Sequence, residues 1–142
     1  MDHNMGPEKI AYLAQIQGVI NRMSTAALAC KGFIATIFAA VVAIVLSGGD
    51  ANGAFALAMS LVPVVLFAFF DMYYFAKELQ YRDVYNEVLA DKHEVDFDMR
   101  VGKVESRIRS RVVKSISIWP FYLVFLFAYL VVFVVLIIDW TF

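Results

Sequence analysis

The feature that most constrains this chain is a run from Trp119 to Ile138 that contains no charged residue. A helix needs about 20 apolar residues to cross about 30 Å of hydrocarbon, and this run supplies them. Pro120 suits the first turn of such a helix. Trp119 and Trp140 bracket the run and would lie about 31 Å apart on it, which matches two interfacial aromatic belts. The run therefore predicts a membrane span.

Two further apolar runs predict two more spans. The first covers residues 26–46 and is interrupted only by Lys31, and the second covers 54–76 and contains Asp71. The turn-forming residues 47–53 between them are too few for anything but a tight connection. Composition agrees, because 62% of the residues are hydrophobic and 18% charged, against about half and a quarter in soluble domains. We expect a single all-α integral membrane domain with three transmembrane helices (26–46, 54–76 and 119–138).

The basic residues predict the orientation of these spans. The N-terminal segment together with Lys31 holds three Lys or Arg, and residues 77–118 hold nine. The connection between the first two spans and the tail after Ile138 hold none. The positive-inside rule therefore predicts a cytoplasmic N-terminus, a cytoplasmic segment 77–118 and an external C-terminus.

Residues 7–25, before the first span, have the pattern of an amphipathic helix. Pro7 and Glu8 are favourable in a first turn. Apolar residues then recur at spacings of three and four: Leu13, Ile16, Ile20, Met23 and Ala27. This stripe fits a helix lying at the lipid headgroup boundary, and it equally fits a seam against another helix of the same or a neighbouring chain.

Residues 77–118 predict a helical cytoplasmic hairpin with segregated charge. Apolar spacing continues the second span to about residue 90, and a basic amphipathic helix follows from Val101 to Trp119. Residues 77–98 hold seven acids and three bases, whereas 100–114 hold six bases and one acid. The basic face consists of Arg100, Lys103, Arg107, Arg111 and Lys114.

Three interpretations of this charge segregation stay open. Ion pairs could join the two arms, each exposed pair contributing about 0–1 kcal/mol. The basic face could instead hold anionic lipid headgroups, at about 1 kcal/mol per charge. It could also bind an anionic ligand such as a nucleotide, or a cytoplasmic protein.

Lys31 and Asp71 are the charges inside the first two spans. Antiparallel neighbours joined by a tight turn would place them at nearly the same depth. A lone charge in hydrocarbon costs at least about 2.5–3.5 kcal/mol, so we expect the two to form an intramembrane ion pair. Such a pair would fix the register of the two helices, and it could also act as a gate or a relay.

Small and polar residues on the spans indicate a packing face or the lining of a pore. Ala35, Ala39 and Ala43 form a row that lets helices approach closely. The third span is rich in Phe, Val and Leu, and we expect it to face lipid or a neighbouring subunit. The candidate pore or packing face comprises Ala35, Thr36, Ala39, Ala43 and Ser60.

Nothing in the sequence indicates catalysis, a cofactor or a metal. The only histidines are His3 and His93, and no phosphate-binding glycine loop, nucleophile motif or metal-ligand spacing is present. The acidic stretch 91–98 departs from a calcium loop at several positions. Twelve Lys and Arg against thirteen Asp and Glu give no indication of nucleic-acid binding. We expect a protein that is not an enzyme.

Four segments between residues 12 and 85 resemble a known group of small bacterial membrane proteins. These segments are Tyr12–Met23, Lys31–Phe33, Phe70–Tyr74 and Arg82–Tyr85. The pattern is similar to the SLATT type (SMODS- and SLOG-associating two-transmembrane effectors) and related uncharacterised families. It covers roughly residues 10–90, and the third span is additional to the two-span pattern.

The resemblance implies an N-terminal helix, a transmembrane hairpin and a helical cytoplasmic extension. Members of that group tend to be encoded beside nucleotide-second-messenger defence systems, where they are proposed to perforate or depolarise the membrane. We therefore expect a homo-oligomeric effector of the bacterial inner membrane that forms a pore or disrupts membrane integrity in anti-phage defence. The alternative is a membrane-anchored accessory subunit that recruits a cytoplasmic partner. The positions to test are Arg22, Lys31 and Asp71.

Overall fold

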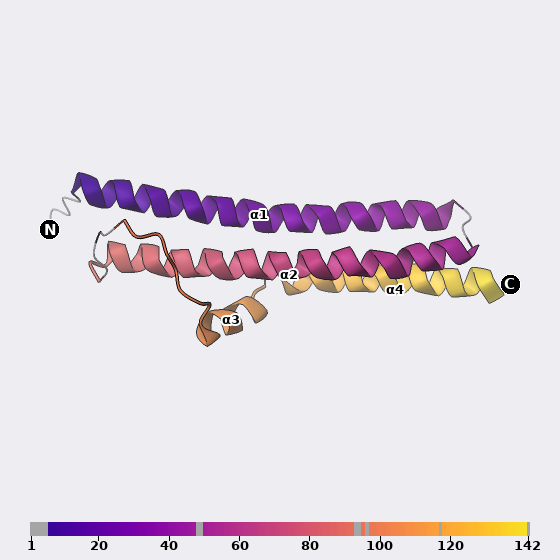
Figure 1. The fold of residues 1–142 in the computed structure, drawn as a ribbon. Coiled ribbons are helices and arrows are strands. Elements are labelled where there is room, and N and C mark those ends of the chain that lie inside the picture. Colours follow the sequence, from indigo (N-terminus) through magenta and orange to yellow (C-terminus); the bar gives the residue numbers. More distant parts are fainter. Residues whose placement is uncertain (1–5, 48–49, 93–94, 96, 117, 142) are drawn as a thin grey trace.

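The computed structural model consists of a long helical hairpin with a third span against one half of it. It describes residues 6–47, 50–92, 95, 97–116 and 118–141. Figure 1 shows α1 and α2 side by side along their length, α4 beside the half of α2 near the α1–α2 connection, and the termini at opposite ends. The helices of the described residues are α1 (Pro7–Leu46), α2 (Asp50–Leu89), α3 (Ser106–Val113) and α4 (Trp119–Thr141).

Both helices of the hairpin are much longer than a membrane is thick. α1 and α2 each contain 40 residues, which corresponds to about 60 Å against about 30 Å of hydrocarbon. α1, α2 and α4 are each long and apolar enough to cross a membrane. We call residues 26–46, 54–76 and α4 the span half, and residues 7–25 and 77–89 the stalk.

The N-terminal amphipathic segment is not a separate helix. α1 runs without a break from Pro7, which occupies its first turn together with Glu8, to the end of the first span. Tyr12 and Ile16 of this segment are buried in a cluster that includes Val88 of α2. Residues 7–25 thus form a seam with α2 of the same chain, which is one of the interpretations that the sequence left open.

The stalk ends at a specific backbone motif. The amide of Lys92 donates to the Glu87 carbonyl at 2.9 Å, and the amide of Asp91 donates to the Val88 carbonyl at 3.2 Å. Asp91 has a φ of 54°. This pattern is a Schellman motif, which satisfies the last carbonyls of a helix by placing one residue in the left-handed region.

The basic arm differs from the prediction. We expected one helix from Val101 to Trp119, but residues 97–105, here called the strap, form no helix, and α3 begins only at Ser106. Arg100 and Lys103 therefore lie on the strap rather than on a helical face. Arg107 and Arg111 are on α3, and Lys114 is the residue at its C-terminal cap.

Hydrogen bonds from the stalk explain why the strap is not helical. Tyr81 donates from its hydroxyl to the Met99 carbonyl at 2.8 Å, and Gln80 Nε2 donates to the Lys103 carbonyl at 3.2 Å. In a helix these carbonyls would face along the axis toward the helix's own amides. Gly102 lowers helix propensity further, by about 1 kcal/mol relative to alanine.

α3 is attached to α2 by its apolar side. Ile108 and Val112 are buried in a cluster with Ala76. Arg111 Nη1 lies 2.8 Å from Asp83 Oδ2, and this ion pair joins α3 to α2. Arg100 also pairs with Asp98, two residues before it in the chain. Among the described residues, the predicted pairing of the acidic with the basic arm thus consists of one salt bridge between the helices and one local pair.

Candidate functional site

Three helices converge on the carboxylate of Asp71. This side chain, on α2, is fully buried. Lys31 of α1 places its Nζ 2.5 Å from Asp71 Oδ1. Tyr122 of α4 donates from its hydroxyl to Asp71 Oδ2 at 2.8 Å. Each carboxylate oxygen is therefore bound by a different neighbouring helix, and one buried group connects all three helices of the span half.

An aromatic ring completes the surroundings of Lys31. The Nζ of Lys31 lies 5.9 Å from the centroid of the Phe121 ring, within the range of a cation–π interaction. The Lys31 side chain is 17% exposed, whereas that of Asp71 has no exposed surface. Part of the Lys31 side chain thus reaches the outer surface of the helices, whereas the carboxylate of Asp71 is enclosed.

A second polar contact connects α4 to α2 at another level. Ser60 donates from its Oγ to the Leu57 carbonyl at 2.7 Å, so the Tyr129 hydroxyl, 3.0 Å away, donates to Ser60 Oγ. Both side chains are buried, and Tyr129 packs beside Val41 of α1. Ser60, predicted on a pore or packing face, is therefore inside the three-helix assembly.

Sequence reasoning did not identify Tyr122 as a partner of Asp71. A tyrosine within an apolar span carries no charge and is not unusual near an interface. The signal that could have revealed it is its spacing to Tyr129, seven positions later, which puts both hydroxyls on one face of α4. That face is the one that contacts α2.

The other residues of the predicted pore or packing face point away from α2 and α4. Ala35, Thr36, Ala39 and Ala43 are all exposed on α1. Thr36 donates its hydroxyl to the Gly32 carbonyl at 2.9 Å, so its polar group is satisfied by its own helix. A Cβ built on Gly32 would meet no atom within 4 Å. We call these five positions the small-residue face.

The structure does not bring the predicted basic face together into one site. Arg111 binds Asp83, and Arg100 binds Asp98 through two side-chain nitrogens at 3.0 Å. Hydrogen bonds from the side chain and backbone of Arg100 hold the pKa of Asp98 below its usual range, and this contact raises the pKa of Arg100. The remaining predicted cations are exposed: Lys103, Arg107 and Lys114.

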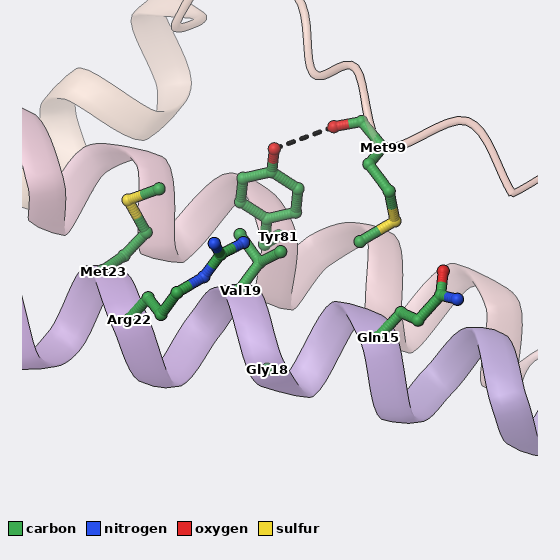
Figure 2. A pocket seen from close by; sticks show the side chains of 7 residues that line it. All are labelled: Gln15, Gly18, Val19, Arg22, Met23, Tyr81 and Met99. Atoms are coloured by element: carbon green, nitrogen blue, oxygen red, sulfur yellow. Dashed lines mark hydrogen bonds between the residues drawn. The ribbon is translucent and has the colours of Figure 1, made fainter.

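Arg22 lies in an open groove on the stalk. It extends from α1 toward Tyr81 of α2, whose hydroxyl bond to the strap closes one side of the groove (Figure 2). The groove has a volume of about 540 Å³ and a mostly apolar lining. Its walls are formed by Gln15, Gly18, Val19, Arg22, Met23, Tyr81 and Met99.

The acidic connection after the stalk gives no metal site in the described residues. Within that part of the chain, no group of three or more His, Cys, Asp or Glu side chains could share a metal ion. Residues 93, 94 and 96 of the stretch 91–98 lie outside the described residues.

Comparison with known proteins adds no relative. No protein-family model, curated protein or solved structure matches this chain.

Proposed function

We propose that this protein is a homo-oligomeric effector of the bacterial inner membrane that makes the membrane permeable, in the context of anti-phage defence. The basic residues of the stalk, strap and α3 orient these parts toward the cytoplasm. The resemblance to the SLATT group supports the same assignment, because that group combines a transmembrane hairpin with a cytoplasmic helical extension.

The small-residue face of α1 carries the proposal. Lipid tails provide no hydrophobic driving force between helices, so association in a membrane depends on close packing of small residues and on hydrogen bonds. Gly32, Ala35 and Ala39 are exposed on the single chain, so its own helices do not pack against this face. A second copy of the chain is the partner that would use this face.

Several copies are also needed to enclose a pathway. The buried polar side chains of the spans, Asp71 and Ser60, are bonded within one chain. Of the residues Trp119–Ile138 of α4, all of which the structure describes, only Tyr129 is buried. A pathway between copies would therefore be apolar and closed by dewetting, and it would open when the helices separate.

Counting subunits and measuring leakage together test this proposal. We expect native mass spectrometry of the detergent-extracted protein to give one closed oligomer larger than a dimer, and proteoliposomes to release potassium. Ala39→Leu should reduce both assembly and release. Ala58→Leu makes the same change at an exposed position on α2 and should leave both intact. A monomeric protein in tight vesicles would reject the proposal.

A scaffold function is the second candidate. Exposed cations on the strap and α3, among them Lys103 and Arg107, favour it because they offer a charged surface to a cytoplasmic protein. A soluble partner that purifies with the protein at fixed stoichiometry, together with electrically silent proteoliposomes, would support this function over the pore.

A further inference from the structure

Exposed apolar side chains gather where α3 leads into α4. Val113 is 55% exposed, Ile116 is 87% exposed and Trp119 is 51% exposed. The indole nitrogen of Trp119 donates to the carbonyl of Val113, so the turn between the helices holds these side chains on one short segment. Large apolar groups this exposed mark a surface that meets a membrane or a partner.

Three cations on α3 and at its C-terminal cap form no ion pair with any other described residue. α3 buries Ile108 and Val112 against α2 and exposes its other sides. Arg111 is bound by Asp83. Within the described residues no ion pair is formed by Arg107, Arg109 or Lys114, which are all exposed.

The position of α3 along the hairpin places this surface at the beginning of a span. α3 packs against Ala76, five residues and thus about 7.5 Å beyond Asp71 along α2. Figure 1 shows α3 projecting from the side of the hairpin at the point where α4 begins. Since α4 begins at Trp119, the cations and the exposed apolar groups lie at the depth where hydrocarbon gives way to headgroups.

We propose that α3, together with Lys114, Ile116 and Trp119, binds anionic phospholipids of the leaflet at this end of α4. Arg107, Arg109 and Lys114 contact the headgroup phosphates, and the apolar side chains enter the boundary beneath them. A soluble anion would use the cations but would leave Ile116 in water. A phospholipid would contact both the cations and the apolar side chains. Because the surface leads directly into α4, it lies where lipid headgroups are present.

Quenching of Trp119 fluorescence tests the proposal on the full-length chain. Trp140→Phe leaves Trp119 as the only tryptophan. This protein is placed in phosphatidylcholine vesicles that contain either brominated phosphatidylglycerol or brominated phosphatidylcholine at equal mole fraction. At low salt we expect the brominated anionic lipid to be enriched about fivefold beside Trp119, the effect of one headgroup–cation attraction.

Matched charge variants identify the residues responsible. Arg107→Gln/Arg109→Gln/Lys114→Gln should equalise quenching by the two lipids, and retained circular dichroism would show that it folds. Arg109→Gln alone should lower the preference for the anionic lipid partly, and it serves as a second variant if the triple variant does not fold. Lys92→Gln/Arg100→Gln removes exposed cations elsewhere and should retain the full preference.

Three outcomes would overturn the proposal. Equal quenching by both lipids in the parent protein would show that no anionic lipid is enriched. An equal loss of the lipid preference in the control variant Lys92→Gln/Arg100→Gln would show that the preference depends on the overall charge of the protein and not on these three cations. Loss on addition of inorganic phosphate at constant ionic strength would show that the surface binds a soluble anion, such as a nucleotide, instead of a lipid.

Discussion

The two halves of the hairpin differ in the side chains that they bury and expose. In the stalk, α1 and α2 bury apolar side chains such as Ile16 and Val88 against each other. In the span half the same two helices bury Asp71 against Lys31 and expose large apolar residues such as Phe33, which is 55% exposed. Both helices continue through the boundary without a break.

The contrast follows from the solvent around each half. In water, apolar burial at about 25 cal/mol per Å² drives helices together. In lipid that term vanishes between helices, and buried polar groups that have no other partner provide specificity instead. Because α1 and α2 are continuous, the register set by Lys31 and Asp71 must also be the one that aligns the stalk core. The ion pair and the stalk core therefore reinforce each other.

Removing Asp71 should have the largest effect. Asp71→Leu leaves the ammonium of Lys31 in the span half without a counter-ion and takes the acceptor from Tyr122. We expect the free energy of unfolding to fall by about 3–5 kcal/mol, because breaking a buried pair leaves one charge uncompensated. Steric-trapping measurements in bicelles would give this value.

The double variant Lys31→Met/Asp71→Leu separates pairing from simple loss of polarity. We expect it to recover most of the lost stability, since a buried ion pair replaced by apolar residues of similar volume is often neutral. The charge swap Lys31→Asp/Asp71→Lys should also be milder than either single change. Additive losses in these cycles would contradict the pairing.

The second largest effect should come from the stalk core. Ile16 is fully buried, and Ile16→Ala should lower the free energy of unfolding by about 3 kcal/mol through lost burial and the cavity left behind. Ile44→Ala makes the same change at a residue that is 45% exposed in the span half. It should cost less than about 1 kcal/mol, because lipid fills the vacated space. Equal losses would mean that the two halves are not stabilised differently.

Particular residues show how far the sequence could predict this molecule. The spans were predictable because charge is excluded from hydrocarbon, and the scarcity of charge within them directed attention to Lys31 and Asp71. The strap was not predictable. Val101, Val104 and Ile108 keep a helical spacing, but the carbonyls of Met99 and Lys103 accept hydrogen bonds from side chains of the stalk. Those bonds come from residues distant in sequence, and apolar periodicity does not record them.

Two tyrosines on α4 allow a finer comparison within the span half. Tyr122→Phe removes a donor to a carboxylate and should cost about 1.5 kcal/mol, whereas Tyr129→Phe removes a donor to a hydroxyl and should cost about 0.6 kcal/mol. Steric trapping in bicelles would measure both. A larger loss at Tyr129 would show that the apolar packing around it, and not the Asp71 site, fixes α4 in place.

The smallest effect concerns an ion pair that lies in water. Asp98 and Arg100 on the strap form the exposed counterpart of the buried pair, and Arg100 holds the pKa of Asp98 below its ordinary value of 3.8. A carboxyl group with a lowered pKa stabilises the fold above its unfolded pKa, and this contribution is lost as the pH falls through the lowered pKa. We therefore expect the Asp98 carboxyl carbon to titrate below 3.8 by NMR and to shift toward that value in Arg100→Gln, which removes the side-chain hydrogen bonds and keeps the backbone one. Added salt should move the parent value in the same direction, because exposed charges are screened, whereas the Asp71 variants should remain equally damaging at any salt concentration.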